Sequence, residues 1–126
     1  MRAPYCYQPA AERDEPGSAQ LSKRLQVVIV DDQPRARKSL AALLSTWGRE
    51  LEIREADNGR EAVQMVQALQ AHVVLMDVRM PELDGVQATV QIKARWPQVK
   101  VIVLSMYAEH REQALAAGAD AFVGKA

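Results

Sequence analysis

Five polar side chains follow four apolar runs of this chain, each at the point where a run ends. Asp77 comes after VVLM, Asp31 and Asp32 come after LQVVIV, Ser105 comes after VIVL, and Lys125 comes after AFVG. Strand interiors disfavour Asp, and burying a charge is costly unless a partner compensates it. We therefore interpret these five residues as parts of one site rather than as unrelated surface groups.

The residue types at these positions fit the chemistry of a phosphoryl group and a divalent cation. Carboxylates of Asp31, Asp32 and Asp77 that met at one place would repel one another, and at least one pKa would rise unless a cation intervened. Mg²⁺ takes oxygen ligands and keeps several waters, which suits such a cluster. The Ser105 hydroxyl and the Lys125 ammonium would contact oxygens of an incoming phosphoryl group. Asp77 is then expected to be the nucleophile that forms a mixed anhydride.

Each of these residues also has an explanation that involves no site. Asp is a preferred helix N-cap, so Asp31 or Asp32 would cap a helix that begins near Pro34. Ser105 would in the same way cap the helix that follows it, and Lys125 would be a solvated terminal residue. We favour the shared site because four separate strand ends would otherwise have to imitate it by chance.

Short apolar runs alternate with helical patterns from residue 25 onward, and these elements must bring the polar residues together. The pattern predicts strands over 25–30, 51–56, 73–77, 99–105 and 119–125, and helices over 34–47, 59–69, 84–96 and 108–118. The first, third and fourth strands are almost unbroken Val, Ile, Leu and Met, which is typical of a parallel sheet covered by helices on both faces. The carboxyl ends of such strands share one edge, where functional residues collect.

The helix predicted over 34–47 begins with a proline at a favourable first position and has one apolar face. We expect that face, formed by Ala36, Leu40, Leu43 and Trp47, to pack on the sheet. Gly48 follows directly and is expected to be the residue that ends the helix.

Composition excludes several classes of protein. The chain has 126 residues, no net charge and 48% hydrophobic residues, as expected for one folded domain without a basic nucleic-acid-binding or membrane-binding surface. Cys6 is the single cysteine, and His72 and His110, which we interpret as surface residues, have no partners at metal-ligand spacing. Residues 1–24 are rich in Pro and predicted to be a disordered leader, while 25–126 form the domain. Without a signal-peptide core or a long apolar run, a soluble cytoplasmic protein is expected.

The motifs VIVDDQ, VVLMDVRMPELDG, VIVLSMY and AGADAFVGK, in this order, resemble those of the response-regulator receiver domain of two-component signalling. The resemblance covers about Leu25 to Lys125 and is greatest to the subfamily with a C-terminal helix-turn-helix DNA-binding domain. It implies an α/β fold of flavodoxin-like type, a doubly wound five-stranded parallel sheet with strand order 2-1-3-4-5. Because only Ala126 follows Lys125, we expect a truncated domain that lacks the usual fifth helix, exposes apolar surface beside strands one and five, and carries no effector domain.

The resemblance also implies roles for individual residues at the carboxylate cluster. Asp77 matches the phosphoacceptor of the family. Asp31, Asp32 and Asp77 match the residues that bind Mg²⁺, together with the backbone carbonyl of Arg79.

A second group of residues matches the parts of the family that respond to phosphorylation. Ser105 and Lys125 match the residues that contact the phosphoryl group, and Ser105 and Phe122 match the hydroxyl and aromatic residues of the switch. Arg79 and Tyr107 stand at positions that tune the lifetime of the phosphoryl group.

The function implied is a phosphorylation-activated signalling switch, and not a dedicated enzyme, that controls an output such as transcription. A sensor histidine kinase or phosphotransfer protein would supply the phosphoryl group, and a homodimer on activation is compatible with the family. The alternative is a Mg²⁺-dependent phosphatase with an Asp nucleophile, but such enzymes place a second Asp where Arg79 stands. A flavin- or nucleotide-binding module of the same architecture is the third hypothesis, although no Gly-rich loop follows the first strand.

Overall fold

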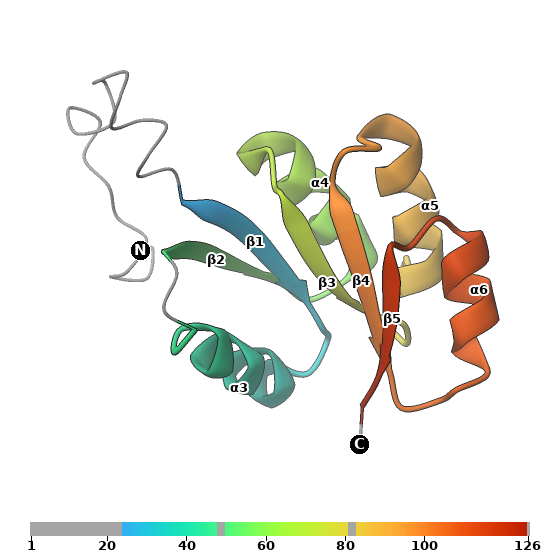
Figure 1. The fold of residues 1–126 in the computed structure, drawn as a ribbon, viewed down its shortest axis with the longest axis horizontal. Coiled ribbons are helices and arrows are strands. Elements are labelled where there is room, and N and C mark those ends of the chain that lie inside the picture. The colour runs from blue at the N-terminus through green and yellow to red at the C-terminus, as the bar shows by residue number, and fades with distance from the viewer. Residues whose placement is uncertain (1–23, 48–49, 81–82, 126) are drawn as a thin grey trace.

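One sheet of five parallel strands, in the order β2-β1-β3-β4-β5, organises the computed structural model, which describes residues 24–47, 50–80 and 83–125 (Figure 1). The order and direction agree with the sequence-based prediction, and every strand end lies within two residues of its predicted position. The predicted leader lies outside the described residues apart from Arg24. The strands are β1 (Leu25–Val30), β2 (Leu51–Ala56), β3 (Val73–Asp77), β4 (Lys100–Ser105) and β5 (Ala121–Gly124).

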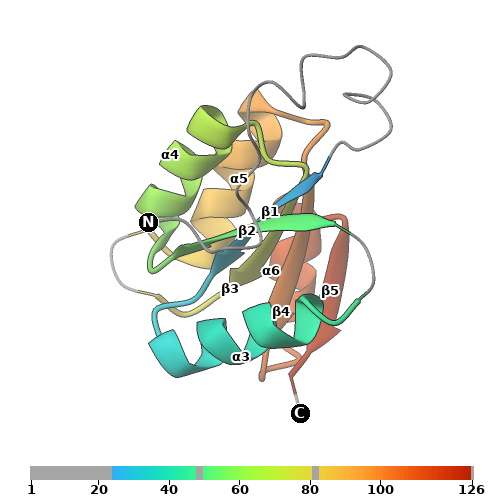
Figure 2. The ribbon, with the colours of Figure 1, turned by 90° about the vertical axis from the view of Figure 1, so that its left-hand side faces the viewer.

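Helices connect successive strands and lie on both faces of the sheet. They are α3 (Pro34–Leu44), α4 (Gly59–Leu69), α5 (Gly85–Arg95) and α6 (His110–Ala116). α3 lies against one face, while α4 and α5 pack together on the other face (Figure 2). α6 contacts α5 and β5 and so continues the α4–α5 layer. In the part of the chain that the structure describes, none of the helices has the length and apolar character needed to cross a membrane.

The turn between β3 and α5 holds the end of β3 firmly. Asp84 caps α5 by accepting a hydrogen bond from Gln87 N at 2.9 Å, and the Gln87 side chain accepts one from Asp84 N in return. Gly85 N donates to Val78 O at 2.9 Å. A Cβ at Gly85 would lie 2.0 Å from Asp77 O, so only glycine allows this close approach. The last residue of β3 is thus fixed by the turn that follows it.

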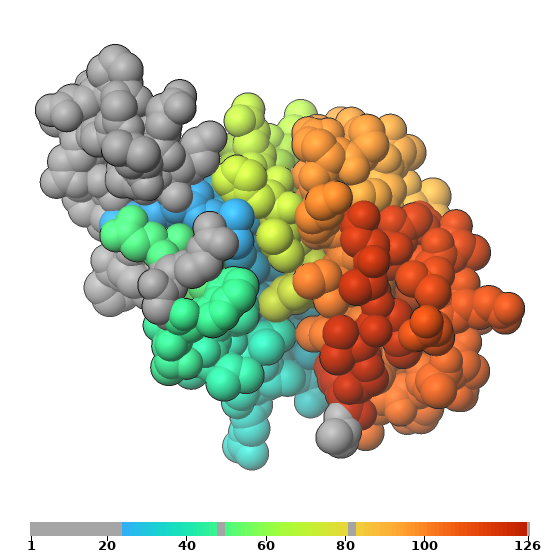
Figure 3. Space-filling model, in the orientation of Figure 1, coloured from blue at the N-terminus to red at the C-terminus, as the bar shows by residue number. Residues whose placement is uncertain are grey.

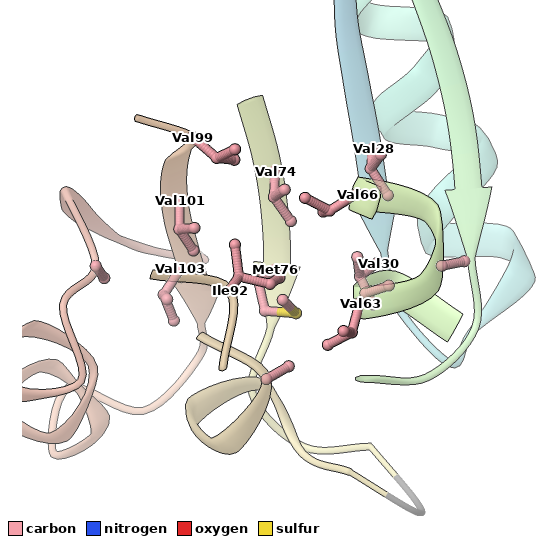
Figure 4. Close-up of a cluster of buried hydrophobic side chains, with 14 of the residues drawn as sticks. Val28, Val30, Val63, Val66, Val74, Met76, Ile92, Val99, Val101 and Val103 are labelled. Carbon is pink, nitrogen blue, oxygen red and sulfur yellow. The ribbon is translucent and has the colours of Figure 1, made fainter. Parts of the chain in front are cut away.

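The larger hydrophobic core lies between the sheet and the α4–α5–α6 layer. Side chains from β1, β3 and β4 point into this layer from the sheet, and Val63, Val66 and Ile92 meet them from α4 and α5 (Figure 4). The side chains in this core with less than 2% exposure include Val28, Val30, Val66, Val74, Met76, Ile92, Val101 and Val103. Burial of this apolar set is the main stabilising contribution to the fold.

A smaller core lies under α3 and corrects one prediction. Leu40, Ala41 and Leu44 pack against β1 and β2, whereas Leu43 and Trp47 are 67% and 59% exposed. The predicted inward face was therefore right for Leu40 and wrong for Leu43, Trp47 and the exposed Ala36. The segment LAALL offers two apolar stripes, and contact with the sheet selects the one that contains Leu44. α3 ends at Leu44, and the predicted end at Gly48 lies outside the described residues.

Coverage of the sheet on the α3 side is incomplete over β3, β4 and β5. Leu75, Ile102 and Leu104 are only half-buried on this side, and Val123 is 48% exposed. Figure 3 shows atoms of β3 and β4 reaching the surface between α3 and β5. Burial on both faces, which was predicted for three strands, therefore holds for β1 but not for β3 and β4. The described helices therefore leave apolar surface of the sheet exposed on the α3 side.

Candidate functional site

Three carboxylates meet at the carboxyl edge of the sheet, as predicted. Asp31 and Asp32 directly follow β1, and Asp77 is the last residue of β3, the neighbouring strand. One carboxylate oxygen from each residue lies within 4.8 Å of the others. Asp31 is buried, Asp77 is half-buried and Asp32 is exposed, so the cluster reaches from the sheet edge to solvent.

The capping explanation for the acidic pair is not supported. Gln33, not an aspartate, occupies the N-cap position of α3, and no side chain caps this helix. Asp31 Oδ1 instead accepts a hydrogen bond from Gln33 N at 2.9 Å. Asp31 O accepts a second one from Arg37 Nη1 at 2.7 Å. These bonds orient Asp31 in the loop and leave its second carboxylate oxygen for the cluster.

Lys125 reaches the cluster from β5, the far edge of the sheet. Its ammonium nitrogen lies 3.0 Å from Asp77 Oδ1 and 3.3 Å from Asp31 Oδ2. Its backbone N donates to Ser105 O at 2.7 Å, which holds the residue beside the end of β4. The explanation of Lys125 as a solvated terminal residue is therefore wrong.

The charges in the cluster are not balanced by Lys125. Burial raises the pKa of Asp77, and the negative charges of Asp31 and Asp32 add to this effect, which the hydrogen bond from Lys125 opposes without cancelling it. Burial lowers the pKa of Lys125, but its hydrogen bond to Asp77 and the charges of Asp77 and Asp31 outweigh burial and raise the pKa overall. The site therefore favours a further cation, and its three carboxylates are the oxygen ligands that Mg²⁺ takes.

An open cavity of about 510 Å³ lies over the carboxylates. Of the predicted site residues, all except Phe122 line it. Its lining consists of Asp31, Asp32, Gln33, Ala36, Asp77, Arg79, Ser105, Met106, Tyr107 and Lys125. Phe122 lies in β5, where it is half-buried and packs against the larger core.

Two side chains form a stack at the mouth of this cavity. The Arg79 guanidinium carbon lies 4.9 Å from the centre of the Tyr107 ring, a cation–π contact between the loop after β3 and the loop after β4. Tyr107 is 40% exposed and Arg79 is also exposed, so the stack forms a solvent-facing part of the cavity lining.

Ser105 lies at the site, but its hydroxyl is bonded toward α6. The residue is 3% exposed, and its Oγ lies 2.7 Å from His110 Nδ1 and accepts a hydrogen bond from Tyr107 N at 3.0 Å. Ser105 does not cap α6, because Glu109 occupies that N-cap position and makes no capping bond with its side chain. The Ser105 side chain thus contacts two residues of the loop and helix that follow it.

Both histidines are half-buried and have hydrogen-bond partners, which their interpretation as surface residues did not include. His110 is half-buried, bonds to Ser105 and sets its ring edge-on to Tyr107 at 5.5 Å. His72 accepts a hydrogen bond from Gln26 N at 2.9 Å through Nδ1, where β1 and β3 begin. The search for metal-ligand spacing missed the contact of His110 with Ser105, because the loop between them has no repeating pattern from which the contact could be predicted.

Comparison with known proteins gives a consistent result. The family profile described as the response regulator receiver domain matches residues 27–126. The response regulator protein VraR of Staphylococcus aureus is 37% identical over 103 residues, which cover 80% of this chain and 49% of that protein. The chain thus spans about half the length of the curated relatives it matches.

Solved structures share the fold. A DNA-binding response regulator of the LuxR family from Staphylococcus aureus has a TM-score of 0.73 at 26% identity, covering 79% of this chain and 85% of that chain. The response regulator TrrA from Thermotoga maritima, crystallised in complex with Mg²⁺ and BeF, has a TM-score of 0.75 at 29% identity, covering 81% and 87%. The LuxR-family relative agrees with the subfamily that the motifs indicated.

Proposed function

The chain belongs to the response regulator receiver domain family, and on that premise we propose that it is a phosphorylation-activated switch with Asp77 as its phosphoacceptor. Receiver domains are signalling modules of two-component systems rather than metabolic enzymes. The observation that carries the proposal is the position of Asp77 between two further carboxylates and Lys125, at the carboxyl edge of the sheet.

Asp77 would act as the nucleophile toward a phosphorylated histidine of a sensor kinase or phosphotransfer protein. A carboxylate oxygen of Asp77 forms the new bond to phosphorus while the bond from phosphorus to the donor imidazole nitrogen breaks. The imidazole leaves with the electron pair of that bond. Hydrolysis of the resulting acyl phosphate by water would return Asp77 to its carboxylate, so the domain catalyses only its own phosphorylation and dephosphorylation.

The carboxylates of Asp31, Asp32 and Asp77 fit Mg²⁺, and the backbone carbonyl of Arg79 is proposed as a fourth ligand. When bound, the ion supplies positive charge for the phosphoryl oxygens. The protein residues have their own part in this step. Asp31 and Asp32 keep the local field negative until a cation arrives, and burial keeps the Asp77 oxygen poorly solvated, which raises its pKa and its basicity.

Lys125 would bind the phosphoryl group directly. Its ammonium already lies 3.0 Å from an oxygen of Asp77. It is therefore within reach of the oxygens of a phosphoryl group attached to that carboxylate. An ammonium has three hydrogen-bond donors, so Lys125 can keep its hydrogen bond to Asp77 or Asp31 while it donates another to the phosphoryl group. Release of part of the Lys125–Asp31 contact would accompany phosphorylation.

Phosphorylation would change the surface formed by α6 and β5. A phosphoryl group adds acceptor oxygens and roughly −1.5 to −2 charge. The Ser105 hydroxyl would turn toward these oxygens and donate a hydrogen bond to one of them. Movement of Ser105 would carry the loop after β4 and allow Phe122 to change its packing. Differential bonding of a few kcal/mol is enough to shift such an equilibrium. We propose control of transcription as the output, because a LuxR-family relative is described as a DNA-binding response regulator. We propose a homodimer as the activated form.

The competing phosphatase hypothesis gains no support from the site. The position two residues after Asp77, where a general acid would stand, holds Arg79, and Arg79 is stacked on Tyr107. A guanidinium does not give up a proton at physiological pH.

Incubation with Mg²⁺ and acetyl phosphate, followed by intact-mass measurement, tests the proposal. One phosphoryl group is expected on the wild-type protein and none on Asp77→Asn. Asp57→Asn is the matched control, because Asp57 is an exposed aspartate outside the three-carboxylate cluster and its variant should label like the wild type. Equal labelling of Asp77→Asn and the wild type would remove Asp77 from this role.

A further inference from the structure

The hydroxyl of Ser105 already has partners on the side of α6. Its oxygen lies 2.7 Å from His110 Nδ1 and 3.0 Å from Tyr107 N. His110 is the first residue of α6, five residues after Ser105. For the part of the chain that the structure describes, no hydrogen bond joins the Ser105 hydroxyl to Asp77 or Lys125. The hydroxyl therefore borders the cavity but is engaged away from the carboxylates.

The hydroxyl has a single proton to donate, and both neutral forms of His110 keep it from the cavity. When Nε2 carries the imidazole proton, Ser105 Oγ donates to His110 Nδ1. When Nδ1 carries it, Nδ1 donates to Ser105 Oγ, and the hydroxyl proton is directed to Tyr107 O at 3.4 Å. In both arrangements the oxygen stays beside His110, so a phosphoryl group must compete with His110 for it.

The His110 ring is held in place by its neighbours. Its backbone N donates to Tyr107 O at 3.1 Å, and its ring meets the Tyr107 ring at an interplanar angle of 68°. Tyr107 in turn lies under the Arg79 guanidinium. A ring fixed on two sides presents Nδ1 to Ser105 at little further entropic cost.

We propose that His110 is a positioning residue that holds the Ser105 hydroxyl in the unphosphorylated arrangement and releases it when Asp77 is phosphorylated. This inference rests on the proposed function and names a regulatory residue of that same site. His110 opposes activation by one hydrogen bond, and its release frees the first residue of α6. The switch at Ser105 is thereby coupled to α6 by a contact within one loop.

Beryllofluoride, which mimics a phosphoryl group on a carboxylate, provides the binding test in the presence of Mg²⁺. His110→Phe keeps a ring against Tyr107 but removes the nitrogen, so it should bind beryllofluoride about two- to tenfold more tightly, as expected for loss of one competing hydrogen bond. His110→Asn restores a short polar side chain to the same position and should return the affinity toward the wild-type value. Unchanged or weaker binding by His110→Phe would overturn the proposal.

A double-mutant cycle with Ser105→Ala separates positioning from general packing. If His110 acts through the Ser105 hydroxyl, His110→Phe should have no effect on affinity in the Ser105→Ala background. An equal effect in both backgrounds would show that His110 acts by another route.

The nitrogen resonances of the two histidines test the same point in the unaltered protein. His72 and His110 are the only histidines in the chain. On addition of Mg²⁺ and beryllofluoride, the Nδ1 resonance of His110 should shift as its bond to Ser105 is lost. His72 lies where β3 begins and serves as the internal reference. A His110 resonance that stays in place while beryllofluoride binds would contradict the inference, whether or not the variants fold.

Failure of this inference is distinguishable from failure of the proposed function. If the wild type does not bind beryllofluoride, or if Asp77→Asn binds it equally well, the proposed function is wrong and this inference falls with it. If the wild type binds beryllofluoride through Asp77 but His110→Phe does not change the affinity, only the role of His110 is wrong.

Discussion

Asp77→Asn is expected to stabilise the fold when no divalent cation is present. The Asp77 carboxylate lies within 4.8 Å of an oxygen of Asp31 and of Asp32, and 3.0 Å from the Lys125 ammonium. At an effective dielectric constant of about 20, each repulsion is about 3.5 kcal/mol and the attraction about 5.5 kcal/mol. The two repulsions together exceed the attraction, and burial of Asp77 adds to the difference.

The net gain in the variant is about 1 kcal/mol, because solvent screens the repulsion from the exposed Asp32. For a domain of this size, that gain corresponds to a rise in Tm of about 4 °C. The raised pKa of Asp77 has the same physical origin, since both report that its charged form is disfavoured in the fold.

Mg²⁺ should reverse the order of stability. At a Mg²⁺ concentration ten times its Kd, the wild type gains about 1.4 kcal/mol by mass action. Asp77→Asn has lost one ligand and should gain much less. The assay is thermal unfolding followed by circular dichroism, with and without Mg²⁺.

The control for this experiment is Asp57→Asn, which removes an exposed carboxylate outside the cluster and should respond to Mg²⁺ like the wild type. A lower Tm for Asp77→Asn in Mg²⁺-free buffer would refute the electrostatic reasoning. An equal response of Asp77→Asn and the wild type to Mg²⁺ would remove Asp77 from the metal site.

Three further predictions concern pH, the Arg79–Tyr107 stack and the turn before β5. The folded pKa of Asp77 lies above 3.8, so Mg²⁺ affinity, measured by calorimetry, should fall as the pH drops through that folded pKa. Without Mg²⁺, the contribution of Asp77 to the free energy of unfolding, measured by thermal unfolding, should rise as the pH drops through the same range. Tyr107→Ala should open the cavity to water and shorten the lifetime of phosphorylated Asp77, measured by the decay of intact mass; an unchanged lifetime would contradict the shielding role of the stack with Arg79. Asp120→Ala should cost about 1–3 kcal/mol in urea unfolding at neutral pH, because Val101 N loses its 2.9 Å acceptor. Burial raises the pKa of Asp120, but the bonds from Val101 and Lys93 outweigh burial and lower it overall. The stabilisation is therefore present above about pH 3.8 and lost as the pH falls through the folded pKa, so the difference from Asp120→Ala should shrink in acid.

The order of the elements and the position of the carboxylates were predictable from the sequence alone. Short, almost unbroken apolar runs such as VVLMD and LQVVIV indicate buried strands. Parallel strands that are joined by helices bring their carboxyl ends to one edge of the sheet. The resemblance to the receiver family implied that the strand before Asp31 lies beside the strand that ends at Asp77, so these two carboxylates were expected to meet at that edge. The same reasoning placed Lys125 near them, although not its distances to both carboxylates.

The rotation of α3 and the coverage of the sheet were decided by tertiary contacts. The segment LAALL fits a helix with either Leu43 or Leu44 facing inward, and only packing against β1 and β2 makes the choice. Likewise β3 and β4 have apolar side chains on both faces, so their sequences do not predict how much of each face the helices cover.

The role of His110 also depended on the tertiary structure. Ser105 was predicted to lie at the site because it ends a strand, and the carboxyl ends of parallel strands share one edge of the sheet. That argument applies only to residues at the ends of regular elements. His110 reaches Ser105 across an irregular loop whose backbone path has no repeating pattern to read, and a displacement of one residue would turn the ring away. The pattern of apolar residues therefore determined which elements form and that the carboxyl ends of the strands share one edge. The side-chain partners across a loop were decided by the backbone path of that loop, because a hydrogen bond requires a position accurate to a few tenths of an ångström.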